Sequence, residues 1–347
     1  MNELATLCKT LKKDFTPKIH DATRPVRSWS EQDVFNGSIV DAYVIIFRTQ
    51  GCSWAFKSGC SMCGYFNDSR WNTVSESELT QQFQTVMSQY KNQPFVKIFT
   101  SGSFLDDNEI KPSVRDHILH TLAKNAKKIS VESRPEYVTD EKLTAIHDIL
   151  KSTTFEVGIG LETANDFIRN HSINKGFTFK DYQQAAITLK KYDANLKTYV
   201  LVKPLFLTEQ ESISDCLKTI EKIDSLTDTV SLNPTNVQRN TVVEYLWKRK
   251  QYRPAWLWSI VEILKQSTAL TNARVKCDIA GGGSIRGAHN CRSCDQSVLQ
   301  AIASFSLKKD LGVFDNLDCT CKETWLDQLD IEQFGFGSLV DFSGGKR

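Results

Sequence analysis

Short runs of apolar and β-branched residues recur along the first two thirds of the chain, separated by longer segments in which apolar positions return every three or four residues. The apolar runs are 41–47, 95–99, 129–132, 155–160, 196–202 and 229–233. The helical segments are 77–90, 114–124, 141–150, 179–190 and 212–223. Strands that alternate with helices predict an α/β fold with a parallel sheet and right-handed crossovers. Six strands fit a partial (β/α)6 barrel, open on one side, at least as well as a doubly wound sheet.

Polar residues and glycines gather directly after the apolar runs. Parallel sheets and barrels place their functional groups at the C-terminal ends of the strands, so these residues are expected at one mouth. In chain order they are the cysteine loop 52–63, Ser101-Gly102-Ser103, Glu132-Ser133-Arg134-Pro135, Gly160-Leu161-Glu162, Lys203-Pro204, and Asn233 with Asn236.

The character of the sequence changes on both sides of this alternation. Residues 1–38 are polar and contain prolines, which predicts an N-terminal extension, and 39–236 are the predicted barrel. Residues 237–347 are expected to form a separate C-terminal region. Within it, the stretch 245–258 mixes tyrosine and tryptophan with lysine and arginine. Such a stretch can stack on or track RNA, or it can be an amphipathic helix packed on the barrel, and the sequence leaves both open.

The bulk composition is that of an ordinary globular enzyme. The 43 Lys and Arg residues against 41 Asp and Glu give a net charge of +2, which neither supports nor excludes an RNA partner. No apolar run approaches the ~20 residues that cross a bilayer, and the first residues do not resemble a secretory signal. We therefore expect a cytoplasmic protein without membrane association. Most of the ten cysteines are clustered, which in an intracellular chain indicates metal binding before disulfides.

The first cysteine group has the spacing C-x7-C-x2-C, formed by Cys52, Cys60 and Cys63. Three thiols are one short of a closed zinc site or a closed four-iron cluster. A 4Fe–4S cluster held by three thiolates leaves one iron open, which S-adenosylmethionine can chelate before an electron cleaves its sulfonium to a radical. The alternatives are zinc with a fourth ligand from elsewhere, or thiols that bind no metal.

The second cysteine group consists of two tight pairs, Cys291 with Cys294 and Cys319 with Cys321. Two pairs complete a tetrahedral zinc site of four thiolates. Cys277 and His289 are close enough in sequence to replace one ligand. A second iron–sulfur cluster is the alternative, although the position outside the strand mouth favours structural zinc.

The first group and the strand ends together resemble the radical S-adenosylmethionine superfamily, in particular its Elongator catalytic-subunit branch. The motifs are the three-cysteine loop, the Ser101-Gly102-Ser103 turn, the E-S-R-P segment at 132–135 and the G-x-G-x-E segment at 158–162. The resemblance implies that Met62, where an aromatic residue is usual, lies near the adenine. It also implies that the 101–103 turn holds the methionine amino group, and that the polar groups of Glu132, Arg134 and Glu162 reach the ribose or carboxylate.

The second group resembles a narrower family. The sequence Arg286-Gly287-Ala288-His289-Asn290-Cys291-x-x-Cys294-Asp295 is similar to the R-G-P-H-N-C-x-x-C-D signature of the RaSEA family of archaeosine synthase subunits, with Ala288 in place of proline. This resemblance implies a lyase that acts on archaeal tRNA after an ArcS-type subunit has joined lysine to a 7-deazaguanine base in the D-loop. It would cleave the lysine C–N bond, and an external donor would supply the electron that starts the reaction.

Two further expectations follow, together with two rival functions. Lys203 is expected either to meet the carboxylate of the attached lysine or to form a structural ion pair. Asn233 and Asn236 are similarly placed at a strand end, or simply form a turn.

One rival function is that of another Elongator-like radical enzyme with a different substrate. The other is a non-catalytic iron–sulfur and zinc RNA-binding subunit, which would leave Ser103, Glu132, Arg134 and Glu162 without a purpose.

Overall fold

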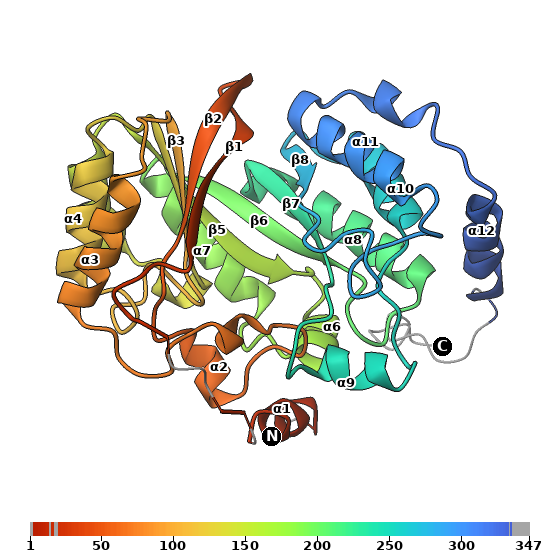
Figure 1. Cartoon of the computed structure of the whole chain (residues 1–347). Coiled ribbons are helices and arrows are strands. Elements are labelled where there is room, and N and C mark those ends of the chain that lie inside the picture. Colours follow the sequence, from red (N-terminus) through yellow and green to blue (C-terminus); the bar gives the residue numbers. More distant parts are fainter. Residues whose placement is uncertain (1–2, 14, 17–19, 333, 335–347) are drawn as a thin grey trace.

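A computed structural model describes residues 3–13, 15–16, 20–332 and 334. Eight strands form one curled sheet in the order of the sequence (Figure 1). β1 pairs antiparallel with β2, and β2 to β8 are all parallel. The strands are β1 (Arg27–Phe35), β2 (Ser38–Ile46), β3 (Phe95–Phe99), β4 (Lys128–Glu132), β5 (Thr154–Glu162), β6 (Asn195–Val202), β7 (Thr229–Pro234) and β8 (Arg274–Cys277).

The six predicted strands are confirmed as β2 to β7, and so is the partial barrel. The sheet continues beyond both expected boundaries, however. β1 comes from the segment predicted as an extension, and β8 from the predicted C-terminal region. The edges of the sheet therefore do not coincide with the boundaries at 38/39 and 236/237.

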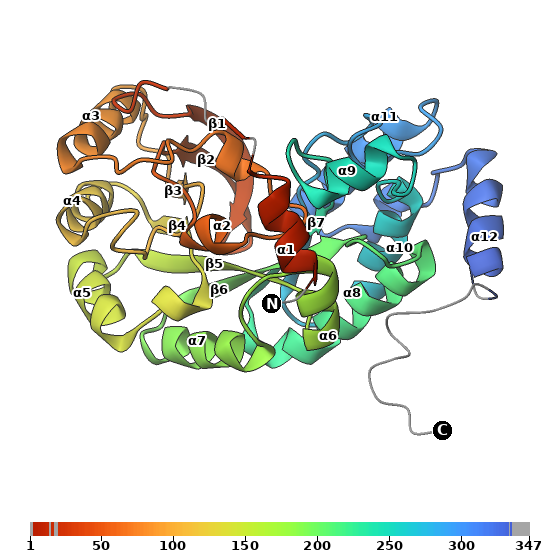
Figure 2. The same ribbon diagram turned by 90° about the horizontal axis from the view of Figure 1, so that it is seen from below.

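Helices cover the outer face of the sheet, while α1, α2, α6 and α9 lie at the mouth (Figures 1 and 2). Side-chain caps begin several outer helices. Thr208 and Glu211, for example, form a capping box that starts α8, as expected where a helix follows a strand-end loop. The helices are α1 (Glu3–Thr10), α2 (Ser53–Lys57), α3 (Glu76–Met87), α4 (Pro112–Leu122), α5 (Asp140–Leu150), α6 (Asp166–Ile168), α7 (Phe179–Lys191), α8 (Glu209–Ile223), α9 (Val242–Lys248), α10 (Leu257–Ser267), α11 (Asp295–Lys308) and α12 (Cys321–Glu332). None of the described helices combines the length and apolar composition that a bilayer crossing requires.

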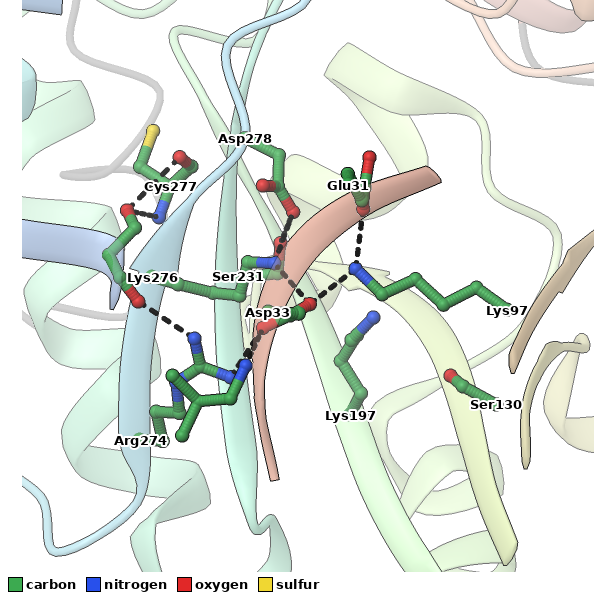
Figure 3. A network of polar contacts seen from close by, with 12 residues as sticks. Glu31, Asp33, Lys97, Ser130, Lys197, Ser231, Arg274, Lys276, Cys277 and Asp278 are labelled. Atoms are coloured by element: carbon green, nitrogen blue, oxygen red, sulfur yellow. Dashed lines mark hydrogen bonds and ion pairs between the residues drawn. The ribbon is translucent and has the colours of Figure 1, made fainter. Parts of the chain in front are cut away.

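An ion network joins the two edge strands across the open side of the barrel (Figure 3). Asp33 on β1 is 2% exposed and contacts Arg274 at 2.8 Å and Lys276 at 3.1 Å, both on β8. It also pairs with Lys97 on β3, which reaches Glu31 at 2.6 Å. Within the described residues no backbone ladder links β1 to β8. Side-chain ion pairs therefore hold the two edges together.

Two apolar clusters organise the molecule. The larger one packs the sheet against the outer helices and includes Trp258, Phe305 and Trp325 of the C-terminal region. The smaller one joins Leu4 and Cys8 of α1 to Val242 and Val243 of α9. The N-terminal helix thus packs at the mouth of the barrel, beside the cysteine loop (Figure 2).

Candidate functional site

The cysteine loop, residues 52–63, follows β2 and is fastened to the segment that follows β5. Trp54 Nε1 donates to the Asn174 carbonyl at 2.8 Å, and the Asn174 side-chain amide donates back to the Gly59 carbonyl at 2.7 Å. Ser61 adds a bond from Oγ to the Ser172 carbonyl at 2.6 Å. These contacts fix the loop at the C-terminal edge of the sheet, where the sequence predicted it.

Gly176 allows this close approach. Its φ is +79°, and a Cβ built there would lie 2.5 Å from Trp54 Cζ2. Only glycine adopts this backbone conformation readily and also leaves room for the indole.

The three thiols of the loop lie near one another. Burial, followed by the thiols of Cys60 and Cys52, raises the pKa of Cys63 to about 12. Burial also raises the pKa of Cys52, and Cys60 contributes to that shift. In the described part of the chain these thiols do not form a compact set around a single ion, unlike the C-terminal cysteines.

Three cations approach the thiols. Arg134 lowers the pKa of Cys52, and Lys175 lowers that of Cys63, in both cases against the effect of burial. Burial lowers the pKa of Lys12, and all three thiols oppose this shift. Lys12 Nζ is held over the loop by the Ser58 carbonyl at 2.9 Å. Nearby positive charge favours thiolates, and the site is therefore suited to an anionic cluster.

The predicted glycine turn meets the cysteine loop directly. A Cβ on Gly102 would lie 2.7 Å from Cys52 Cα and 2.2 Å from Glu109 Oε2. Glu109 accepts from Ser103 N and from Thr49 Oγ1, both at 2.5 Å. Burial raises the pKa of Glu109 to about 7. A buried carboxyl group thus holds the turn that is expected to bind the amino group of S-adenosylmethionine.

The predicted residues at the ends of β4 and β5 lie in one group. The Arg134 guanidinium lies over Trp54 and donates to the Lys175 carbonyl at 3.0 Å. Lys175 Nζ pairs with Glu162 at 2.6 Å. Burial raises the pKa of Glu132, and a hydrogen bond from Tyr199 opposes this shift.

Ser103 links this group to the glycine turn, because its Oγ accepts from Arg134 N at 3.0 Å. The turn at 101–103 is therefore joined both to the cysteine loop and to the ends of β4 and β5. Whether these groups contact S-adenosylmethionine stays a prediction.

Lys203 forms the structural ion pair that the sequence left as an alternative. Its Nζ pairs with Glu209 at the start of α8. Glu209 also accepts from Trp256 N at 2.8 Å and from Ser259 Oγ at 2.6 Å. The lysine and the carboxylate are both buried. The ammonium is thus held toward the outer helices, which argues against its predicted contact with a substrate carboxylate.

Three other predicted residues have identifiable surroundings. Met62 packs against the apolar cluster formed by α1 and α9. Asn233 accepts a long bond from Ser231 Oγ at 3.3 Å, and Asn236 lies against Gly281. None of these contacts tests a role in binding S-adenosylmethionine or substrate.

The aromatic and basic stretch 245–258 divides into two parts. Trp256 and Trp258 are 8% and 3% exposed and belong to the main core, as the packing alternative predicted. The earlier part stays at the surface. There Trp247, Lys250 and Arg253, with Gln251 and Tyr252 between them, line an open hollow of about 480 Å³.

The C-terminal cysteines converge on one point. Their Sγ atoms all lie within 4.8 Å of one another, with Cys291 to Cys294 at 3.9 Å, Cys291 to Cys319 at 3.6 Å and Cys294 to Cys321 at 3.6 Å. Zn–S bonds of about 2.3 Å in a tetrahedron separate the sulfurs by about 3.8 Å. The four predicted ligands are therefore arranged as one tetrahedral ion requires.

The motif around these cysteines supports the site. Asn290 donates to Cys294 Sγ at 3.4 Å and accepts from Leu257 N at 2.9 Å, while Trp258 Nε1 donates to Cys321 Sγ at 3.3 Å. N–H donors to sulfur stabilise thiolates. The same motif reaches the mouth, because Arg286 Nε donates to the Val237 carbonyl at 2.9 Å and its guanidinium stacks over Trp247.

The two alternative ligands lie outside this group. Cys277 is 4% exposed in the main core, where its backbone N donates to Ser306 Oγ at 3.0 Å. His289 Nδ1 is 2.8 Å from the Gly287 carbonyl. Among the described residues neither belongs to the four-thiol set, and their role as alternative ligands stays a prediction.

Several residues of the site could not be found from the sequence. Lys12, Glu109, Lys175 and Tyr199 lie outside any recognised motif and meet the loop or the strand ends only in the folded chain. The one available signal concerned Tyr199, which stands two residues after a lysine in an otherwise apolar run. This pattern indicates polar groups on the inner face of a strand.

The chain is similar to two proteins named archaeosine synthase subunit beta. It is 43% identical to that of Methanosarcina acetivorans over 91% of this chain and 93% of the relative. It is 39% identical to that of Thermococcus kodakarensis over 86% of this chain and 94% of the relative.

More distant similarities involve Elongator proteins. Elongator complex protein 3 of Saccharomyces cerevisiae is 22% identical over 54% of this chain and 33% of its own length. The solved structure of Methanocaldococcus infernus Elp3 matches with a TM-score of 0.47 at 14% identity, over 67% of this chain and 59% of that one. No protein-family model matches the chain.

Proposed function

This chain belongs to the family of archaeosine synthase beta subunits, and from that membership we propose that it is a radical S-adenosylmethionine enzyme that modifies tRNA. The observation that carries the proposal is the three-thiol loop, held at the C-terminal edge of a partial barrel and surrounded by cations. A non-catalytic RNA-binding subunit would have no use for the polar groups collected at that edge.

In this proposal Cys52, Cys60 and Cys63 hold a 4Fe–4S cluster. The reduced cluster with bound S-adenosylmethionine supplies a 5′-deoxyadenosyl radical, which can take hydrogen from an unactivated carbon. Arg134 and Lys175 offset the negative charge of the thiolates. An external donor supplies the electron.

The residues of the strand ends position S-adenosylmethionine. Glu109 fixes the 101–103 turn beside Cys52 through Ser103 N, and the turn takes the methionine amino group. Glu132, Arg134 and Glu162 provide the polar contacts to the ribose or carboxylate. Met62 lies next to the loop cysteine and contributes an apolar contact near the adenine.

We further propose that the substrate is a 7-deazaguanine base in tRNA that carries a lysine joined through its ε-nitrogen. Removal of hydrogen from the ε-carbon, followed by loss of one electron that would replace the one supplied for cleavage of S-adenosylmethionine, leaves an iminium carbon that water attacks. S-adenosylmethionine would then be the net two-electron oxidant. The C–N bond then breaks to give an aldehyde of lysine and the amidine of archaeosine. The partner is an ArcS-type subunit that attaches the lysine.

For the four-thiol site we propose zinc. The measured sulfur separations of 3.6–3.9 Å support one tetrahedral ion, because four thiolates on a single centre must lie this close. The open hollow lined by Trp247, Lys250 and Arg253 combines stacking and positive charge, and we propose it as an RNA contact.

The test uses anaerobically reconstituted protein with S-adenosylmethionine, dithionite and lysine-bearing tRNA. Formation of 5′-deoxyadenosine together with archaeosine, both measured by mass spectrometry, supports the full proposal. Deoxyadenosine without archaeosine would limit it to a radical enzyme with another substrate. A protein with a full complement of iron that forms no deoxyadenosine would contradict it.

Elemental analysis should give about four irons and one zinc per chain, whereas about eight irons and no zinc would indicate a second cluster.

A further inference from the structure

One cation inside the barrel lacks the partner that its neighbours have. Lys97, Lys128 and Lys276 each reach a carboxylate oxygen at 3.1 Å or less. Lys197 is 4% exposed, and its nearest carboxylate is Glu156 at 3.8 Å. Among the described residues no hydrogen bond to its Nζ is formed. Figure 3 shows Lys97 and Lys276 joined to acidic groups, and Lys197 among them without such a line.

Glu156 cannot remedy this deficit. Its Oε2 accepts from Lys128 Nζ at 2.5 Å and its Oε1 from Ser130 Oγ at 2.8 Å. Each carboxylate oxygen therefore already has a closer donor. A buried ammonium without hydrogen bonds is unfavourable unless something else supplies acceptors.

Lys197 points into the barrel. Charges on β3, β5 and β8 all act on it, because Lys97, Glu156 and Lys276 each shift its pKa. Strands this far apart in the sheet can bring side chains to one point only across its concave face. After the effect of burial, Glu156 raises the pKa of Lys197, while the two lysines lower it. Asp278 also raises the pKa, and the ammonium lies 5.5 Å from the centroid of the Tyr199 ring, so Lys197 has weak electrostatic contacts but no close acceptor.

The register places Lys197 in the row of Glu132 but below the mouth, because Lys197 is the third residue of β6 and is aligned with Thr229, the first residue of β7. Glu132, the last residue of β4, is aligned with Gly158 on β5, and Gly158 is aligned with Lys197 on β6. Aligned residues of parallel strands project to the same face. The residue between the two charged groups is a glycine, and the Tyr199 ring lies over it, since a Cβ built on Gly158 would be 3.0 Å from Tyr199 Cε2. Tyr199 hydrogen-bonds to Glu132, and its ring lies beside the Lys197 ammonium.

We propose that Lys197 binds the carboxylate of the α-amino acid group on the substrate. This inference rests on the proposed function, because it takes the attached lysine as the ligand. The α-carbon of that lysine extends away from the reacting ε-carbon, so its carboxylate reaches deeper into the barrel than the bond that breaks. Lys197 supplies the ammonium that Lys203, paired with Glu209, does not. A charge-assisted hydrogen bond to a desolvated carboxylate gives both binding and orientation.

The test compares two tRNA substrates on one enzyme. One carries lysine, and the other carries 1,5-diaminopentane, which lacks only the carboxylate. We expect the native holoenzyme to prefer the lysine substrate in kcat/KM by about 10- to 100-fold. In Lys197→Met the preference should fall to about one, and Lys197→Arg should retain part of it. Because both substrates are run on the same preparation, partial loss of cluster or of folded protein cancels in the ratio.

Lys142→Met is the control for the lysine-to-methionine change, since Lys142 is a half-buried lysine on α5 that pairs with Asp107 at 3.3 Å and is not among the groups that act on Lys197. It should keep the native preference even if it is less stable. A native preference in Lys197→Met would overturn the inference, as would an equal loss in both lysine variants.

A binding measurement separates this inference from the proposed function. Free L-lysine and 1,5-diaminopentane are titrated into the anaerobic holoenzyme in a calorimeter. Selective binding of L-lysine that Lys197→Met abolishes would support the carboxylate site even if the tRNA substrate were not turned over. If native enzyme turns over lysine-bearing tRNA and Lys197→Met has the native preference, the carboxylate site fails alone. If there is neither turnover nor lysine binding, both proposals fail.

Discussion

The two cysteine groups, which we propose as metal sites, arrange their thiols in different ways. The C-terminal group brings four sulfurs within 4.8 Å of one another, with three pairs at 3.6–3.9 Å, in one small motif and two adjoining helices. The loop group has three thiols, whose position depends on residues 110 or more places away along the chain. One site is complete in itself, and the other is left with a ligand position to fill.

This difference teaches how each site relates to the fold. A closed set of four thiolates is suited to stability, because metal binding then contributes directly to folding. A three-thiol site gains nothing of that kind and is suited to chemistry. Its surroundings agree, since cations and a buried carboxyl group with a raised pKa lie beside the loop.

The largest expected effect separates the two groups outright. Cys60→Ala should lose the iron cluster and all formation of 5′-deoxyadenosine, because three thiols leave no spare ligand, yet it should keep its zinc. Iron and zinc analysis and deoxyadenosine yield check this. Cys216→Ala, which removes a buried cysteine far from both sites on α8, is the control and should keep the cluster. Full iron content in Cys60→Ala would refute the assignment.

The converse change is Cys294→Ala. Loss of one zinc ligand should lower the melting temperature markedly, since apparent zinc-binding free energies in small thiolate sites are on the order of 10 kcal/mol. The folded fraction should still form deoxyadenosine. Cys277→Ala is the control: it leaves a core cavity that costs about 1–3 kcal/mol but retains zinc. If Cys294→Ala were stable and failed only in radical formation, the second site would take part in the chemistry.

A smaller effect is expected where the loop meets the glycine turn. Gly102→Ala places a Cβ 2.7 Å from Cys52 Cα, which strains the contact by about 1–3 kcal/mol. Affinity for S-adenosylmethionine should fall about tenfold and the melting temperature by several degrees, while zinc content is unchanged. Equilibrium binding to the reconstituted protein measures it, and unaltered affinity would show that the turn lies away from the ligand.

The smallest effect concerns thiol reactivity in protein freed of metal. Hydrogen bonding from the backbone at Cys294 lowers the pKa of the exposed Cys291 to about 6, whereas burial raises that of Cys321 to about 12. Cys291 is then a thiolate at neutral pH. Its alkylation should rise with pH to about 6 and then level off, while Cys321 stays protonated and slow. Peptide mapping by mass spectrometry follows both residues, and added zinc should suppress labelling of Cys291.

The sequence revealed those parts of the fold that are determined by a local pattern of residues. The six parallel strands stood out because buried strands are continuous apolar runs, and the four-thiol ligands stood out because they are paired. β1 was missed because its sequence, RSWSEQDVF, is polar and half-buried, and β8 because it has only four residues with two charges. The partners of the cysteine loop were missed because they meet it only through the tertiary fold.

Lysines within apolar runs carried more information than the sequence interpretation took from them. Lys97 and Lys276 each stand inside a short strand between apolar neighbours, and Lys197 stands between Leu196 and Thr198 in a mostly apolar strand. In a sheet with both faces covered, such a residue has to face an interior that provides partners. Charged groups therefore also line the inside of the barrel, which the strand-end pattern alone did not indicate.

The ionic junction between β1 and β8 gives the barrel a mechanical property. Strands joined by backbone hydrogen bonds can shift only in whole steps, since each register pairs a fixed set of amides. Ion pairs between Asp33 and the two β8 cations impose no such step. The junction can widen or narrow by fractions of an ångström at modest cost, and salt should soften it only weakly because the carboxylate is buried. The spacing between β1 and β8 can therefore adjust, and with it the width of the barrel, while the hydrogen-bonded strand pairs keep their register.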